Sequence, residues 1–230
     1  MADRVPLDFD PPVRQLRALL LGVTDEDLTA PTPCPGWTVG DLLDHIMGFS
    51  WAFAQAARKS TDAPGVSGPP PPPSAANLPP HWRSRLPVLL EELATAWKDP
   101  AAWTGTATAG GVTMPAAAMG SVAMNELVMH SWDLAQSTGQ EFAADPRILE
   151  ALIDFLSQGP AEGTPGLFGP RVPADDEATL LEQVVGLAGR DPSWQRFGRR
   201  RRKGFTARQA TAPSTESAER GAHPSTAAVE

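Results

Sequence analysis

Apolar residues recur three and four positions apart along much of the chain, which is the spacing of helices that bury one face. This pattern predicts six helices, the first beginning near residue 11 and the others spanning about residues 38–59, 81–98, 115–138, 145–158 and 175–187. Thr38 with Asp41 forms a variant of the capping box at the start of the second helix. Pro115 and Gly139 stand where the fourth should begin and end. The pattern therefore predicts an all-α bundle with decorated loops.

Three stretches do not follow this pattern. Residues 61–80 are rich in Pro, Gly, Ser and Ala and include five consecutive prolines, which favours a stiff extended connector over a docking segment for a partner. Residues 103–114 are rich in Thr and Gly and predict a small hairpin. Residues 195–230 lack the apolar surface that a core needs. We therefore expect one domain over residues 1–194, followed by a basic, disordered C-terminal tail.

The chain contains a single cysteine, Cys34. This excludes an internal disulfide framework, Cys-rich zinc fingers and Cys-ligated iron–sulfur clusters, because each needs several sulfurs. The first residues are acidic and interrupted by proline, unlike a secretory signal, and no apolar run approaches the roughly 20 residues of a membrane span. A cytoplasmic protein without a membrane segment is the expectation.

The formal charge of -8 is unevenly distributed, since 19 basic and 27 acidic residues do not share the same regions. From Arg196 onward there are eight basic and three acidic residues, which leaves 11 basic and 24 acidic residues in the preceding part. So acidic a body repels phosphate backbones, and we expect no nucleic-acid binding by the folded part. The Arg-rich tail can contact an acidic surface, although a solvated tail is the favoured interpretation.

Three polar residues occupy apolar stripes of the predicted helices. Glu126 and His130 lie on the buried face of the fourth helix, four residues or about 6 Å apart along its axis. His45 lies between Leu42 and Phe49 on the buried face of the second. A buried carboxylate is costly unless it is paired or bound to a cation. The three side chains therefore suggest the ligands of a zinc site with an open fourth position, while a metal-free hydrogen-bonded cluster is the alternative.

Neighbouring residues suggest supporting roles. Asp41 lies one turn before His45 and Asp133 three residues after His130, so either carboxylate can accept the second ring N–H of its histidine. Helix capping is an equal alternative for Asp41. Cys34, between two prolines, is interpreted as a buried structural residue rather than a reactive thiol or a fourth ligand. No catalytic residue can be assigned from the sequence.

Two motifs carry a resemblance to a known family. Residues 32–45 (TPCPGWTVGDLLDH) resemble the segment that opens the metal-binding domain of mycothiol-dependent maleylpyruvate isomerase and its relatives in the DinB-like superfamily. Residues 125–135 (NELVMHSWDLA) are similar to that family's second metal motif. Residues 189–194 (GRDPSW) resemble the ending of an actinobacterial metal-binding branch.

The resemblance implies a DinB-like four-helix bundle with extra short helices. By matching position, it implies that His45, Glu126 and His130 bind a divalent metal, usually zinc. It further implies that mycothiol or a similar thiol is activated at the metal and attacks a small electrophile, as in a thiol transferase or an isomerase. A non-catalytic metal-binding or stress-associated bundle is the alternative. The isomerase has a C-terminal domain for which no counterpart is expected after Trp194, and the sequence leaves open whether the bundle forms a homodimer.

Overall fold

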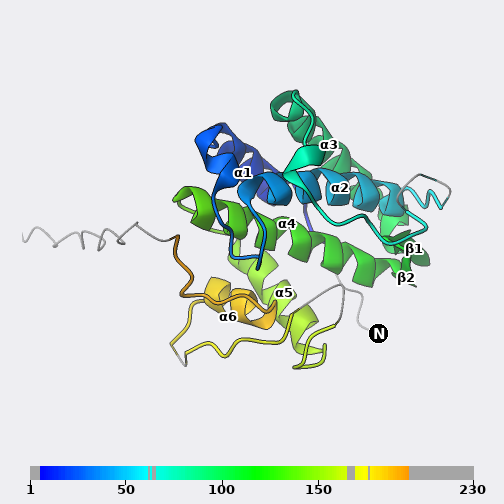
Figure 1. Cartoon of the computed structure of the whole chain (residues 1–230). Coiled ribbons are helices and arrows are strands. Elements are labelled where there is room, and N and C mark those ends of the chain that lie inside the picture. The colour runs from blue at the N-terminus through cyan, green and yellow to red at the C-terminus, as the bar shows by residue number, and fades with distance from the viewer. Residues whose placement is uncertain (1–5, 62, 64–65, 165–168, 176, 197–230) are drawn as a thin grey trace, which may run out of the picture. The chain divides into compact units, whose positions relative to one another are not determined.

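The structure, a computed structural model, describes residues 6–61, 63, 66–164, 169–175 and 177–196. Over these residues the chain forms α-helices with the following bounds: α1 (Asp10–Leu21), α2 (Val39–Ala57), α3 (Trp82–Trp97), α4 (Ala116–Thr138), α5 (Pro146–Ser157) and α6 (Leu180–Leu187) (Figure 1). The strands β1 (Thr106–Ala109) and β2 (Val112–Pro115) form a small antiparallel hairpin. The prediction of an all-α fold is confirmed.

The first four helices form the bundle. α2 packs against α3 and α4, while α1 packs against the same two helices (Figure 1). α5 covers another side of α4 and pairs with α6. α4 is consequently buried around most of its circumference, beyond the single apolar face read from the sequence. Polar side chains on α4 are therefore inside the protein, where each needs a partner.

The predicted start of α2 is confirmed in detail. Thr38 is its N-cap and accepts a hydrogen bond from the backbone N–H of Asp41, whose carboxylate in turn accepts one from the backbone N–H of Thr38. This reciprocal cap fixes the direction in which the helix leaves the preceding loop. The helix ends at Ala57, two residues before the predicted end. Gly139, at a φ of 68°, terminates α4 in the left-handed conformation, as predicted.

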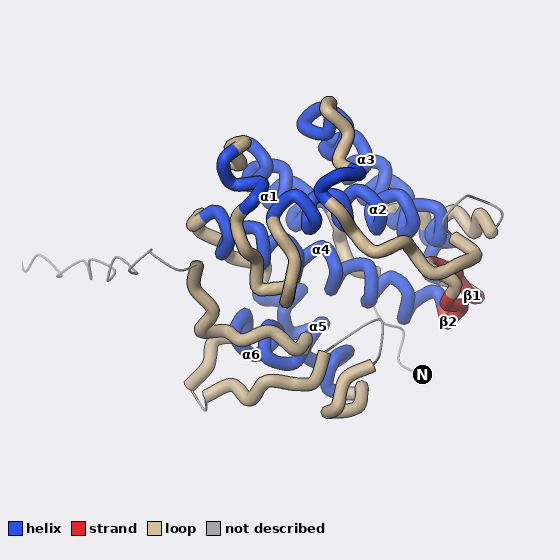
Figure 2. The backbone as a smooth tube through the Cα atoms, in the orientation of Figure 1, coloured by secondary structure: helices blue, strands red, loops and turns tan. Residues whose placement is uncertain are grey.

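The proline-rich segment is attached to the bundle. Residues 69–74 lack regular secondary structure, as expected, but Ala75–Asn77 form a 3-10 turn that the sequence did not suggest. The backbone N–H groups of Ser74 and Ala75 donate to the carboxylates of Asp44 and Asp41 on α2, at 3.0 and 2.7 Å. The C-terminal end of the segment therefore lies against the N-terminal turns of α2. Figure 2 shows the hairpin of β1 and β2 in red at one end of α4.

The C-terminal part of the described chain departs from prediction at α6. This helix begins at Leu180, not near residue 175, because Thr179 forms a capping box with Glu182. Arg196, assigned to the tail by the sequence, donates hydrogen bonds to Asp27 and to the carbonyl of Ser137, both at 3.0 Å. The predicted disordered tail otherwise lies outside the described residues.

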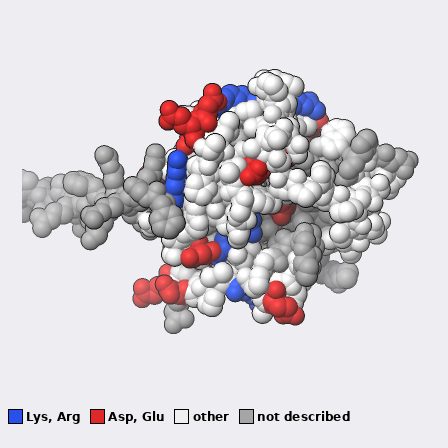
Figure 3. All heavy atoms as spheres, viewed as in Figure 1, with Lys and Arg blue, Asp and Glu red and all other residues white. Residues whose placement is uncertain are grey.

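Two surface properties bear on function. No helix among the described residues is long and apolar enough to cross a membrane. On the face in Figure 3, the Lys and Arg side chains of the described residues occur in small separate groups with acidic side chains among them. This face therefore offers no continuous basic surface for a phosphate backbone within the described part.

Candidate metal centre

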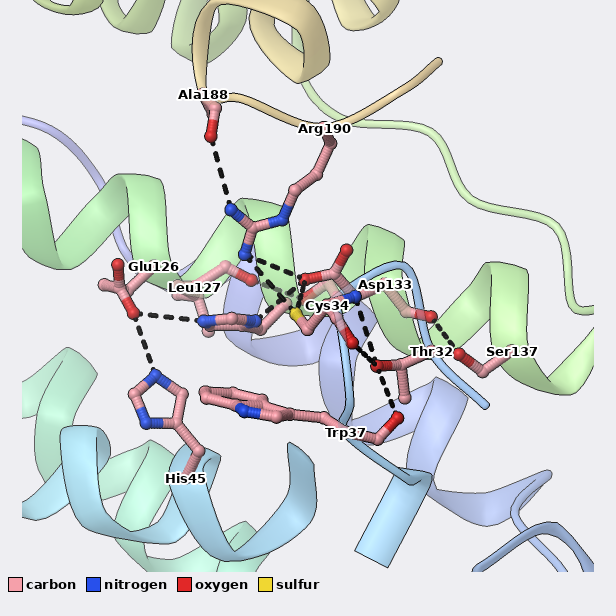
Figure 4. A network of polar contacts seen from close by, with 12 residues as sticks. Thr32, Cys34, Trp37, His45, Glu126, Leu127, Asp133, Ser137, Ala188 and Arg190 are labelled. Carbon is pink, nitrogen blue, oxygen red and sulfur yellow. Dashed lines mark hydrogen bonds and ion pairs between the residues drawn. The ribbon is translucent and has the colours of Figure 1, made fainter. Parts of the chain in front are cut away.

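Three side chains from α2 and α4 converge on one point. The Nε2 atom of His45 and the Nε2 atom of His130 each lie 3.1 Å from the same carboxylate oxygen, Oε2 of Glu126 (Figure 4). One turn of α4 separates Glu126 from His130, so both side chains leave the same face of the helix. The packing of α2 against α4 brings His45 to this pair from the opposite side.

Aromatic rings surround the two imidazoles. The ring of Trp37 lies 5.1 Å from that of His45 and stacks on that of His130 at 6.2 Å, measured between centroids. Phe49, one turn after His45, contacts both imidazoles at 5.6 and 5.9 Å. A short hydrogen-bonded loop before α2 holds Trp37 in this position, with the N–H of Thr32 donating to the carbonyl of Trp37 at 3.1 Å. The rings restrict how far the histidines can rotate.

The centre is partly exposed on one side. The side chains of His45 and Glu126 are 24% and 17% exposed, whereas that of His130 is 4% exposed. His45 and Glu126 therefore lie nearer to solvent, while His130 forms the inner wall.

The surroundings of the centre shift the pKa values of Glu126 and His130 in opposite directions. Burial opposes ionisation of Glu126, but the hydrogen bonds and charge of His130 and His45 outweigh it and lower the pKa of Glu126 well below its usual range. Burial likewise opposes protonation of His130. Its hydrogen bonds to Asp133, Cys34 and Glu126 outweigh burial and raise the pKa of His130 well above its ordinary value. The carboxylate oxygen is thus a site where positive charge is stabilised.

The geometry of the three donor atoms fits a small divalent cation. The ligand atoms of His45, Glu126 and His130 all lie within 4.8 Å of one another. Two ligands about 2.1 Å from a tetrahedral zinc ion are about 3.4 Å apart, close to the 3.1 Å found here between each imidazole nitrogen and the carboxylate oxygen. Two imidazoles and one carboxylate are also a ligand set of catalytic zinc sites. That these residues bind a metal remains a prediction.

The second nitrogen of His130 faces a separate polar cluster. Its Nδ1 lies 2.9 Å from Oδ2 of Asp133, a side chain with no exposed surface. The same oxygen lies 3.2 Å from Sγ of Cys34 and 3.4 Å from a guanidinium nitrogen of Arg190 (Figure 4). Burial raises the pKa of Asp133, but its bond to His130 and the charge of Arg190 outweigh burial and lower it. We call Cys34, Asp133 and Arg190 the inner cluster.

The supporting residues suggested by the sequence have different outcomes. Asp133 does contact the free nitrogen of its histidine. Asp41 does not contact His45, because its two carboxylate oxygens accept hydrogen bonds from Thr38 and Ala75, so the capping alternative describes its position. Cys34 is buried, and its Sγ lies with Asp133 on the Nδ1 side of His130, away from the convergence point at Nε2. The structure therefore does not place it as a fourth ligand.

Arg190 was not identified from the sequence as a site residue. The motif of residues 189–194 drew attention only as a family resemblance, although a buried carboxylate such as Asp133 does require a cation nearby. Because 57 positions separate Asp133 from Arg190, no helical periodicity connects them.

Comparisons with known proteins agree with this architecture. The family model of the mycothiol maleylpyruvate isomerase N-terminal domain matches residues 9–135, which include His45, Glu126 and His130. Two uncharacterized proteins of Mycobacterium tuberculosis, one from strain CDC 1551 / Oshkosh and one from strain H37Rv, are each 27% identical over 179 residues. These matches cover 75% of this chain and 90% of each relative.

Solved structures show the same fold. Mycothiol-dependent maleylpyruvate isomerase superposes with a TM-score of 0.51 at 22% identity, covering 80% of this chain and 88% of that one. A mutant of that enzyme gives the same TM-score at 21% identity, with 80% and 87% covered. These likenesses cover most of both chains and show that the fold is shared.

Proposed function

Because the chain belongs to the family of the mycothiol maleylpyruvate isomerase N-terminal domain, we propose that it is a divalent-metal enzyme that uses a small thiol. His45, Glu126 and His130 hold the ion, for which zinc fits the donor set best. The observation that carries the proposal is the convergence of two imidazole nitrogens on one carboxylate oxygen, with an opening beside them.

The chemistry we assign is activation of the thiol. When bound, the ion would lower the pKa of a thiol placed beside it, so that the nucleophilic thiolate forms near neutral pH. Glu126 and the two histidines orient the site, and Trp37 and Phe49 exclude water from its inner wall. In an isomerase the thiolate would add to an electrophilic double bond and be eliminated again after bond rotation, whereas in a transferase it would displace a leaving group that departs with its electron pair. This is the chemistry of a thiol transferase or an isomerase.

The fixed charges of the described site residues favour one anionic ligand. Glu126 and Asp133 are ionised and Arg190 is a cation, so these three charges sum to -1; the two imidazoles add none, because metal ligation requires their neutral form. A divalent ion changes this sum to +1, and one bound thiolate neutralises it. A neutral buried site avoids the cost of an isolated charge. The arrangement therefore supports mycothiol or a similar thiol as the anionic cosubstrate.

The first experiment measures metal. The protein, purified without a His tag and without chelators, should contain close to one equivalent of zinc by elemental analysis. His45→Ala and Glu126→Ala should contain less than a tenth of an equivalent, because each removes a ligand. His81→Ala is the matched control, since His81 is exposed and outside the centre, and should retain the metal. A wild-type protein without metal would refute the proposal and favour a metal-free bundle.

The second experiment measures catalysis. Turnover of generic electrophiles should depend on mycothiol and on the metal, and should fall to background in His45→Ala and Glu126→Ala. Equal rates in the wild type and both variants would exclude the enzyme and leave a non-catalytic metal-binding module. For the setting, we propose the reducing cytoplasm of an actinobacterium, supported by the mycobacterial relatives and the unpaired, buried Cys34.

A further inference from the structure

The C-terminal segment after α6 inserts a cation into the interior of the bundle. Arg190 lies outside residues 9–135, the part matched by the family model, yet its guanidinium group reaches α4. One terminal nitrogen lies 3.4 Å from Oδ2 of Asp133 and 3.5 Å from Sγ of Cys34. The other donates to the carbonyl of Ala188 at 3.2 Å (Figure 4). The Arg190 side chain is only 18% exposed, so its charge has been brought in from water.

The backbone around Arg190 is held firmly. The N–H of Arg190 donates to the carbonyl of Val185 at 2.9 Å, and the N–H of Val172 donates to the carbonyl of Gly186 at 2.9 Å. Gly189, at a φ of 80°, packs so closely on Gly169 that a Cβ would lie 2.8 Å from its backbone. A larger residue at position 189 would displace the segment. The fold therefore fixes the point from which the arginine extends.

Asp133 connects this cation with the proposed metal centre. Its Oδ2 atom receives the guanidinium group on one side and lies 2.9 Å from Nδ1 of His130 on the other. A hydrogen bond donated by Nδ1 to Asp133 keeps a proton on that nitrogen, which leaves Nε2, on the side of Glu126, as the atom that would bind a metal ion in place of its own proton. A carboxylate without a cation in this buried position would be strongly disfavoured in its ionised form.

We propose that Arg190 is a positioning residue that acts through Asp133 to hold His130 in the orientation and tautomer that metal binding requires. This inference rests on the proposed function, since it concerns a ligand of the metal. The described residues contain a second group of donor atoms that could hold a metal ion, formed by Cys34, His130 and Asp133. The permanent charge of Arg190 balances Asp133 there, so no second metal ion is needed.

The test compares zinc affinity in matched variants. Arg190→Met removes the charge and the hydrogen bonds but keeps a long side chain, and Arg147→Met is the control because Arg147 is 89% exposed on α5. We expect Arg190→Met to raise the zinc Kd about 10–100-fold, the usual effect of losing a partner of a metal ligand, and Arg147→Met to leave it unchanged. The Kd is measured by competition with a chromogenic chelator at a temperature where circular dichroism shows every variant to be folded.

Two further variants separate positioning from simple stabilisation. In an Asp133→Asn background, Arg190→Met should add less than twofold to the Kd, because its effect passes through Asp133. Arg190→Lys, which keeps the charge and loses the planar fork, should have a Kd between those of the wild type and Arg190→Met and covers the case in which Arg190→Met does not fold. The visible absorption of the cobalt-substituted protein should shift in Arg190→Met, whereas a purely structural role would lower only the Tm.

The outcomes are distinct. A wild-type protein that binds no zinc refutes the proposed function and this inference with it. If the wild type binds zinc, and the zinc Kd of Arg190→Lys and of every folded Arg190→Met sample lies within twofold of the wild-type value, the positioning role alone is refuted. Multiplicative effects of Arg190→Met and Asp133→Asn would also overturn it, because they would show that the arginine acts independently of Asp133.

Discussion

The two nitrogens of His130 face regions with opposite properties. On the Nε2 side lie Glu126 and His45, which are partly exposed, and both imidazoles contact the same carboxylate oxygen of Glu126. On the Nδ1 side lies the inner cluster, in which Asp133 has no exposed surface and Cys34 is buried. Both sides contain one ionised carboxylate next to the same imidazole. They differ in the source of the positive charge that balances it.

This difference separates a site that exchanges cations from one that does not. The guanidinium group of Arg190 keeps its proton at any physiological pH, so Asp133 is paired permanently. Among the described residues, the hydrogen-bond partners of Glu126 are the two histidines, and a metal ion can displace the protons that these histidines carry into solvent. In our proposal the inner cluster is therefore a fixed support, and the metal and its ligand bind and dissociate on the Nε2 side. The predictions below test this division.

The largest loss of stability should follow Asp133→Ala. It leaves Arg190 buried without its carboxylate, and breaking a buried pair in this way costs about 3–5 kcal/mol. Urea denaturation of the metal-free protein measures the free energy of unfolding, with exposed Asp154→Ala as a control expected within about 0.5 kcal/mol of wild type. Replacing both partners, in Asp133→Leu with Arg190→Met, should restore much of the loss. A loss below about 1 kcal/mol for Asp133→Ala would show that the inner cluster is not a desolvated pair.

On the Nε2 side of His130, Glu126→Gln should raise the zinc Kd more than about a hundredfold. This exceeds the loss of about 10–100-fold that is usual when a residue supporting a metal ligand is removed. Glutamine keeps the size of the side chain but removes the charge that a cation needs. Competition titration gives the Kd, and Glu150→Gln, at an exposed position of α5, is the matched control. If Glu126→Gln bound zinc as tightly as wild type, the Nε2 side of His130 would not be the metal site.

The helical framework could be predicted from the sequence because its signals are local. Apolar spacing, the capping residues at Thr38 and Asp41, and the left-handed glycine at Gly139 each depend on a few neighbouring positions. The same locality brought Glu126 and His130 together, one turn apart on α4. The predicted start of α6 was too early because the polar residues before Thr179 are compatible with a helix. Only the capping box of Thr179 and Glu182 identifies the true start.

The inner cluster could not be predicted, because it depends on tertiary contacts. Arg190 reaches Asp133 only after α6 has packed on α5 and α5 on α4, and no spacing rule relates the two positions. The role of Asp41 was ambiguous for a similar reason. Asp41 has a second carboxylate oxygen that could in principle accept a hydrogen bond from His45. This oxygen instead accepts one from the N–H of Ala75, which the proline-rich segment brings back onto α2.

An intermediate effect is expected for Gly186→Ala, which tests whether the backbone that carries Arg190 matters. A Cβ at position 186 would lie 2.5 Å from the carbonyl oxygen of Val172, so backbone must move. We expect a loss of about 1–3 kcal/mol in the free energy of unfolding, as for other overpacked sites, and a weaker zinc affinity. Gly48→Ala is the control, because nothing lies within 4 Å of a Cβ on that exposed position of α2, and it should stabilise by about 0.5–1 kcal/mol. If Gly186→Ala were clearly destabilised but its zinc affinity unchanged, the backbone segment that carries Arg190 would not affect the proposed metal centre.

The smallest effect, for Asp41→Asn, distinguishes a cap from a ligand partner. Partial burial raises the pKa of Asp41, but hydrogen bonds from Thr38 and Ala75 outweigh it and lower the pKa below 3.8. The ionised cap therefore stabilises the fold above that value, and this contribution is lost as pH falls through the lowered pKa. Asp41→Asn should cost about 1 kcal/mol at pH 7 and less near pH 3, measured by urea denaturation, while zinc affinity at pH 7 stays within twofold of wild type. A tenfold loss of affinity would instead mean that Asp41 supports His45, and that both proposed ligands, His45 as well as His130, depend on a neighbouring carboxylate.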